Sequence, residues 1–202
     1  MECLDKALKL NPEDWSIWDN KGRALFNLKR FDEAIACFEK ALELSPKNYE
    51  ILHLKGLSLA NLGRYEESIR CLNEALRLNP DFIPALIAKG EVLLNMDRYN
   101  EALNCFNDVL VKDPSNIDAL ILKAITLSEI GLHKDAIDCC NKVLEINSNN
   151  GIAWYYRARF EVKLGNKEEA LKCLRKAIEI NPQFAELAEN DEDLKTLLES
   201  LK

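Results

Sequence analysis

The sequence predicts an all-α protein built by repeating one helix-turn-helix unit, and three observations lead to this prediction. Hydrophobic residues make up 48% of the 202 residues and charged residues 30%, which suits a folded chain with a core. The 7 Gly and 6 Pro are too few for the many turns of a β-sandwich. Six of the seven cysteines recur every 34 residues, which indicates a repeated unit. They are Cys3, Cys37, Cys71, Cys105, Cys139 and Cys173.

The even spacing of these cysteines argues against a disulfide framework or a zinc site. Both kinds of site use clustered cysteines such as Cys-x-x-Cys, which the sequence lacks. We therefore expect buried, unpaired thiols and no bound metal. A redox or metal role for the adjacent pair Cys139 and Cys140 is the alternative.

Other residue types follow the same period. A basic residue stands at one position of every unit, a small residue at two others, and proline at a fourth in all boundaries but one. The columns are Lys21, Lys55, Lys89, Lys123 and Arg157; Gly22, Gly56, Gly90, Ala124 and Ala158; Ala34, Ser68, Ala102, Ala136 and Ala170; and Pro12, Pro46, Pro80, Pro114 and Pro182, with Ser148 in the gap.

Each unit reads as two helices. In the first unit, apolar and small residues recur at helical spacing over residues 15–28 and again over 31–44. Glycine ends the first helix in three units, where a left-handed residue is favoured, and Asn-Pro, Ser-Pro or Asp-Pro follows the second helix. The expected turn glycines are Gly63, Gly131 and Gly165, and the expected N-caps are Asp14, Asn48, Asn116 and Asn150.

In chain order, residues 1–14 correspond to the second helix of an incomplete unit. Five complete units follow at 15–48, 49–82, 83–116, 117–150 and 151–184. Starting with half a unit favours a fragment of a longer protein, or an N-terminal face that meets a partner, because terminal repeats normally carry a polar cap.

Residues 185–202 leave the repeat pattern. A short helical turn is expected around Phe184, and Asp191 is expected to N-cap a final helix. This segment is predicted to cover the exposed side of the last unit, with a partner-binding tail as the alternative. The apolar residues of the final helix are Leu194, Leu197, Leu198 and Leu201.

The pattern Trp18-x2-Lys21-Gly22-x2-Leu25, followed by Ala34-x3-Phe38 and Pro46, resembles the tetratricopeptide repeat, or TPR. The resemblance extends over residues 1–184. It implies a right-handed superhelical solenoid of TPR helix-turn-helix repeats. Position 7 departs from the family's usual Leu because it is Lys or Arg throughout, and position 11 is Leu or Glu161 in place of an aromatic residue.

The position of a side chain on the first helix of each repeat decides whether it can face a partner. At about 100° per residue, positions 4, 8 and 11 share the packing face, and positions 2, 5, 9, 12 and 13 lie opposite. In the TPR family the second set lines a concave groove that binds partner peptides. The groove residues expected here are Asp19, Arg23, Asn27, His53, Leu57, Asn61, Ile87, Glu91, Leu94, Asn95, Ile121, Ile125, Tyr155, Tyr156 and Arg159.

An apolar stripe dominates the expected groove. Contiguous exposed apolar residues usually mark an interaction site, although stacking of the repeats could bury part of this set. The stripe consists of Leu57, Ile87, Leu94, Ile121, Ile125 and Tyr155. Beside it, the amides of Asn27, Asn61 and Asn95 either pair with a ligand's backbone or cap local helix carbonyls.

The charge pattern limits the classes of partner. TPR domains that grip chaperone C-termini need a Lys, Asn and Arg set that these positions do not complete, so an amphipathic helix or extended apolar segment suits the groove better. The basic column at position 7 is expected to pair internally, the alternative being a cationic track for an acidic ligand. The net charge of −7 argues against sequence-independent nucleic-acid binding.

Catalytic and membrane-spanning signatures are missing from the sequence. The two histidines, His53 and His133, fall at different repeat positions, and no nucleophile elbow, HExxH or phosphate-binding glycine loop occurs. No apolar run approaches a membrane span, and the N-terminus does not read as a signal peptide. We expect a cytoplasmic protein that is not an enzyme and has no cofactor or metal.

The sequence therefore predicts a non-catalytic scaffold that binds a peptide or helix of another protein in an apolar groove. Two alternatives stay open. The chain could be the TPR part of a larger enzyme or regulator whose activity lies elsewhere. It could also self-associate, through the incomplete N-terminal repeat or the C-terminal helix.

Overall fold

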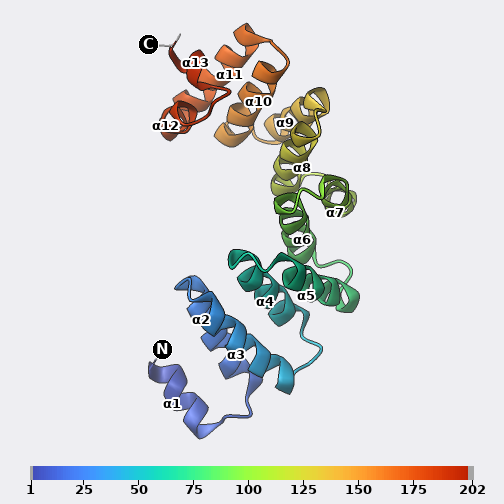
Figure 1. Cartoon of the computed structure of the whole chain (residues 1–202), viewed down its shortest axis with the longest axis vertical. Helices are drawn as coiled ribbons and strands as arrows, with labels where there is room; N and C mark the ends of the chain where they lie inside the picture. The colour runs from blue at the N-terminus through green and yellow to red at the C-terminus, as the bar shows by residue number, and fades with distance from the viewer. Residues whose placement is uncertain (1, 200–202) are drawn as a thin grey trace. The chain divides into compact units, whose positions relative to one another are not determined.

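The chain folds entirely into α-helices and turns over residues 2–199, the part described by this computed structural model (Figure 1). No strand occurs among these residues, which confirms the all-α prediction. The helices form two compact units divided between Arg98 and Tyr99. This division falls inside the expected third repeat, between its two helices.

The first unit contains six helices among its described residues. They are α1 (Glu2–Leu10), α2 (Trp15–Asn27), α3 (Phe31–Leu44), α4 (Tyr49–Asn61), α5 (Tyr65–Leu78) and α6 (Ile83–Asn95). The second unit contains α7 (Tyr99–Lys112), α8 (Ile117–Glu129), α9 (His133–Ile146), α10 (Gly151–Lys163), α11 (Lys167–Ile180), α12 (Gln183–Glu189) and α13 (Lys195–Glu199).

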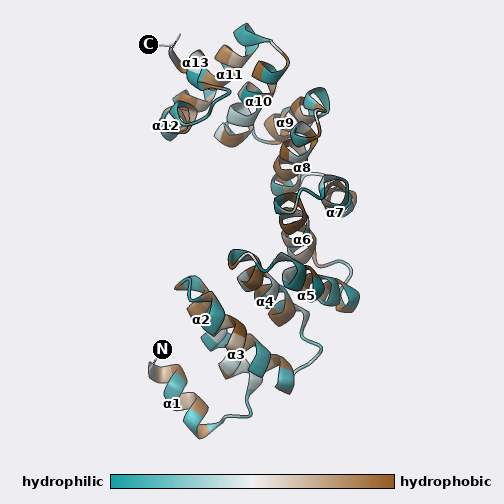
Figure 2. Cartoon of the chain, in the orientation of Figure 1, coloured by the Kyte–Doolittle hydropathy of each residue, from teal (hydrophilic) through white to brown (hydrophobic). Residues whose placement is uncertain are grey.

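Consecutive helices pack against one another within each unit. The first helices of neighbouring repeats also touch, α2 with α4 and α4 with α6 in the first unit, and α8 with α10 in the second. Hydrophobic residues make up most of α6 and α8 (Figure 2), which suits helices with neighbours on several sides. Within each unit, this arrangement lines up the first helices, and with them the expected groove positions.

The helix starts follow the predicted caps. Asp14 accepts a hydrogen bond from the Ser16 N–H at 2.9 Å, and Asn116 and Asn150 accept from the N–H groups three residues on. Asn48 accepts from both Glu50 and Ile51. Helix α6 follows Phe82, which gives no side-chain cap, but carries Pro84 in its first turn, where a missing N–H costs no helix hydrogen bond.

The turn between the two helices of a repeat uses one backbone conformation. Gly63, Gly131 and Gly165 have φ values of 74°, 82° and 81°, as expected from the sequence. Lys29 and Asp97 stand at the same repeat position and adopt φ values of 59° and 57°. The left-handed turn therefore recurs even where glycine is absent, which the sequence did not indicate.

The C-terminal segment closes the core of the second unit. Phe184 and Leu194 are buried in one cluster with Tyr155 and Leu174, so this part of the segment packs on the last repeat. Leu201 lies outside the described residues. Helix α13 begins at Lys195 and not directly after Asp191, because the Asp191 side chain first accepts from the Asp193 N–H and its carbonyl from the Leu194 N–H.

No disulfide joins the seven cysteines, all of which lie within residues 2–199, and five of the seven are buried. The expectation of burial is wrong for Cys3, which is exposed, and Cys71 is half-buried. In the complete repeats the first helix packs over this position, whereas α1 has no such helix before it among the described residues. No cluster of His, Cys, Asp and Glu within residues 2–199 could hold a metal ion.

Candidate binding groove

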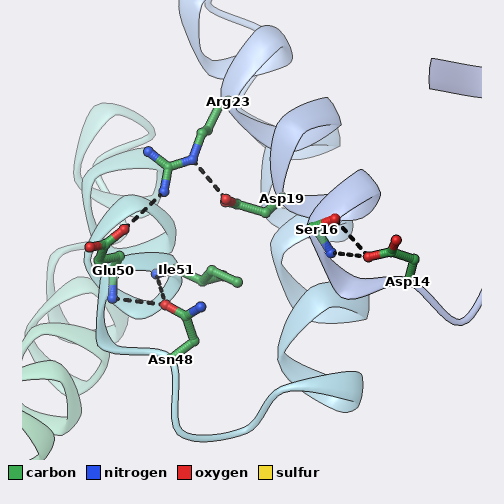
Figure 3. Close-up of polar contacts among 7 residues, drawn as sticks. All are labelled: Asp14, Ser16, Asp19, Arg23, Asn48, Glu50 and Ile51. Carbon is green, nitrogen blue, oxygen red and sulfur yellow. Dashed lines mark hydrogen bonds and ion pairs between the residues drawn. The ribbon is translucent and has the colours of Figure 1, made fainter. Parts of the chain in front are cut away.

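An ion-pair network joins the first helices of repeats one and two. Asp19 is buried on α2, and its Oδ2 accepts from Arg23 Nε at 2.8 Å. Arg23 reaches on to Glu50 Oε2 on α4 at 3.4 Å (Figure 3). Asp19 Oδ1 has no hydrogen-bond partner among the described residues. Asp19 and Arg23 therefore form part of the joint between two repeats, in addition to lying at groove positions.

His53 lies beside this network. Its ring meets the Phe82 ring edge-on at 5.3 Å between centroids, and Phe82 meets Tyr49 in the same way at 4.9 Å. Burial lowers the pKa of His53, and the nearby Arg23 guanidinium lowers it further. His53 is therefore neutral near pH 7, and it presents an aromatic, uncharged surface to this part of the groove.

The apolar groove residues of the first unit are half-buried. Leu57 packs against the core cluster of Leu52, Leu72 and Val92, so part of the stripe is taken up by repeat packing. Ile87 and Leu94 on α6 also keep part of their surface accessible. Packing between repeats therefore buries part of the apolar stripe, which agrees with the alternative interpretation of the sequence.

The three asparagines beside the stripe are described separately, because the role of one of them is clear from its hydrogen bond. Asn61 Nδ2 donates to the Leu57 carbonyl at 2.9 Å, which is the local helix-end contact considered as one alternative. Asn27 and Asn95 are exposed at the ends of α2 and α6, as is Glu91 on α6.

In the second unit, Ile121 and Ile125 lie half-buried on α8. Ile121 packs against Leu120, Val143 and Ala153, so it supports the core as well as the groove face. Ile125 is one turn further along the same face of α8.

The expected groove residues of repeat five are covered by the chain's own C-terminal segment. Tyr155 is only 8% exposed, its ring stacks on Phe184 at 5.4 Å, and its hydroxyl donates to Asp191 Oδ2 at 2.9 Å. Arg159 Nε lies 2.7 Å from the same oxygen. Burial and the Asp191 hydrogen bond raise the pKa of Tyr155. The expectation that Tyr155 and Arg159 are free to meet a partner is therefore wrong.

Asp193 and Tyr156 also contact Arg159. Asp193 Oδ2 lies 3.6 Å from Arg159 Nη2 and 3.7 Å from Lys163 Nζ. Tyr156 is half-buried, stacks on Phe160 and receives the Arg159 guanidinium over its ring at 5.8 Å. Sequence reasoning assigned Asp191 only a capping role. The sequence did contain a signal for this contact. Asp191 and Asp193 carry two negative charges, which complement the positive charges of Arg159 and Lys163. Arg159 and Lys163 are four residues apart and therefore lie on one helix face.

The basic column at position 7 pairs internally in three repeats. Lys21 binds Asp5 at 2.7 Å, Lys55 binds Glu39 at 2.8 Å, and Arg157 binds Glu169 at 2.9 Å. The expectation of internal pairing is confirmed for these three. No helix of the described chain is long and apolar enough to cross a membrane.

Family models match four stretches of the sequence. Two models described as tetratricopeptide repeat match residues 2–49 and 151–184. A model described as anaphase-promoting complex, cyclosome, subunit 3 matches residues 27–109, and one described as protein prenyltransferase alpha subunit repeat matches residues 133–160. No curated protein matches the chain.

Several solved structures share the fold. YrrB, described as a TPR protein with an unusual peptide-binding site, has a TM-score of 0.70 at 24% identity, over 93% of this chain and 98% of that one. A tetratricopeptide-repeat protein from Parabacteroides merdae has a TM-score of 0.80 at 21% identity, covering 91% and 73%. MamA from Desulfovibrio magneticus has a TM-score of 0.76 at 20% identity, covering 84% and 96%.

Proposed function

The chain belongs to the tetratricopeptide-repeat family, and on this premise we propose that it is a non-catalytic scaffold whose groove binds a peptide or helix of another protein. Proteins with the TPR fold generally act as scaffolds for protein–protein interactions. The observation that carries the proposal is the row of first helices α2, α4 and α6, which present Leu57, Ile87 and Leu94 beside a polar network. An amphipathic helix or extended segment would meet both surfaces.

The covered end of repeat five limits the proposed groove. Tyr155 and Arg159 are already bound by Asp191, so the proposed contact residues are those of repeats one to four. Within the first unit they are Arg23, His53, Leu57, Ile87, Glu91, Leu94 and the exposed Asn27 and Asn95. Within the second unit they are Ile121 and Ile125.

Site-specific photo-crosslinking tests the proposal. A photoreactive phenylalanine analogue replaces Ile87 in the groove, or Val111, which is 82% exposed on α7 outside it. In native lysate, position 87 should capture defined partner proteins that position 111 does not. A Leu94→Glu change, two turns further along the same face of α6, should abolish that capture while helical content stays unchanged. Equal capture at both positions, or capture that survives Leu94→Glu, would place the binding surface elsewhere.

A further inference from the structure

The basic side chains at repeat position 7 differ in which carboxylate forms an ion pair with them. In repeats one and two, the acid comes from the second helix of the preceding repeat: Asp5 lies 16 residues before Lys21, and Glu39 holds the same relation to Lys55. In repeat five, Arg157 pairs with Glu169, 12 residues after it on the second helix of its own repeat. Each repeat thus has two places from which a carboxylate can reach the cation.

Both places are altered in repeat four. The residue that corresponds to Asp5 and Glu39 is Asn107, whose carboxamide is uncharged. The residue that corresponds to Glu169 is Asp135, which is one methylene shorter. Across residues 2–199, Lys123 Nζ forms no ion pair and the Asn107 carboxamide makes no side-chain hydrogen bond. Lys123, which is half-buried, and Asn107, which is exposed, therefore each present a donor group from which no side chain of residues 2–199 accepts.

These groups line a cleft of about 390 Å³. Three helices of the second unit form it: α7, α8 and α9. Its apolar wall is made by Leu103 and by Leu127, and the buried Cys139 lies between the charged residues. The complete lining is Leu103, Asn107, Lys123, Leu127, Asp135, Asp138, Cys139 and Lys142.

We propose that this cleft binds a single carboxylate presented by a partner protein, an Asp or Glu side chain flanked by apolar residues. The carboxylate takes the place that Asp5 and Glu39 occupy beside their lysines in repeats one and two. Lys123 Nζ supplies the charge, and Asn107 Nδ2 supplies a second donor. The apolar neighbours of the acidic residue pack against Leu103 and Leu127.

The other charges in the cleft select for one carboxylate over a polyanion. Asp135 and Asp138 offset Lys123 and Lys142, so the lining has no net formal charge. A phosphate or a nucleic-acid backbone carries more negative charge, so it would meet stronger repulsion from the two aspartates than a single carboxylate beside Lys123. An acidic side chain of a protein is therefore the ligand that the charges favour.

The cleft is separate from the proposed groove. Lys123 and Leu127 are each two residues from a groove residue, Ile121 or Ile125, and two residues correspond to about 200° around a helix. The groove and the cleft therefore lie on opposite sides of α8. Both can be occupied at once, which gives the scaffold a second contact surface.

The test uses the full chain and two small probes, the peptides acetyl-Leu-Glu-Leu-amide and acetyl-Leu-Gln-Leu-amide, followed by chemical-shift changes in NMR. The Glu peptide should shift the signals of α7, α8 and α9 around the cleft in a saturable way. The Gln peptide should bind at least about tenfold more weakly, because it lacks the charge. Equal binding of both peptides, or shifts centred on Ile121 and Ile125, would overturn the proposal.

Two variants examine the site itself. Asn107→Glu restores the internal carboxylate of repeats one and two on an exposed residue, so the chain should stay folded and lose Glu-peptide binding. Lys123→Met should also abolish binding, whereas Lys55→Met, which changes a lysine already paired with Glu39, should leave it unchanged. Retained binding in a folded Asn107→Glu variant would refute the assignment. So would inorganic phosphate that competes with the Glu peptide at equal concentration.

Discussion

At the residue scale, the packing of an aromatic ring explains why repeat position 8 of the first repeat is glycine. A Cβ added at Gly22 would lie 2.5 Å from Cε1 of Phe38, a side chain with no exposed surface. Gly22→Ala should therefore lower the free energy of unfolding by about 1–3 kcal/mol, although alanine favours helix by up to about 1 kcal/mol. Urea denaturation of the variant measures this loss.

The matched control is Gly56→Ala in the next repeat. There the nearest atom is Leu72 Cγ at 3.0 Å, compared with 2.5 Å for the Phe38 ring atom at Gly22, so the buried Leu72 has to move less than the ring. Its loss should be clearly smaller than that of Gly22→Ala. Equal losses, or an unchanged midpoint for Gly22→Ala, would mean that ring packing does not select glycine at this position.

At the element scale, Asp191 holds the C-terminal segment on α10. Its carboxylate accepts from the hydroxyl of the buried Tyr155 and lies against Arg159, which is half-buried. Asp191→Ala should cost about 1–3 kcal/mol, because it leaves the Tyr155 hydroxyl without its acceptor and leaves Arg159 with only the longer contact to Asp193. Amide hydrogen exchange should accelerate in α12 and α13 before the other helices.

The control for this change is Glu192→Ala, one residue away on an exposed side chain. It should leave exchange in α12 and α13 unchanged. Exchange that is equally slow in wild type and Asp191→Ala would show that the apolar contacts of Phe184 and Leu194 hold the segment without the carboxylate.

The same element shows what the sequence could and could not predict. The helices, their caps at Asp14 and Asn48 and the turn at Gly63 follow from local patterns, because each depends on residues within a few positions. The burial of Tyr155 depends on Asp191, 36 residues later in the chain. A helical wheel gives the side on which Tyr155 lies but not the distant segment that covers it. The cleft at Lys123 likewise appears only once α7, α8 and α9 are packed together.

At the scale of the whole molecule, the burial of a thiol in most repeats should lower the free energy of unfolding at alkaline pH. Burial raises the pKa of Cys140 to about 12 and that of Cys173 to about 11, against an ordinary value of 9.0. In the unfolded chain both thiols ionise near the ordinary value. Between pH 9 and 11 the folded state therefore holds protons that unfolding releases, and stability must fall as pH rises.

We expect the free energy of unfolding to decrease between pH 9 and pH 10 by about 1 kcal/mol for each of these two thiols. Urea denaturation at pH 8, 9 and 10, under reducing conditions, measures the slope. The double variant Cys140→Ala and Cys173→Ala should be less stable at pH 8, because it leaves space in the core, and should have a shallower slope above pH 9. An identical slope in the wild type and the double variant would show that other groups, and not the buried thiols, govern alkaline stability.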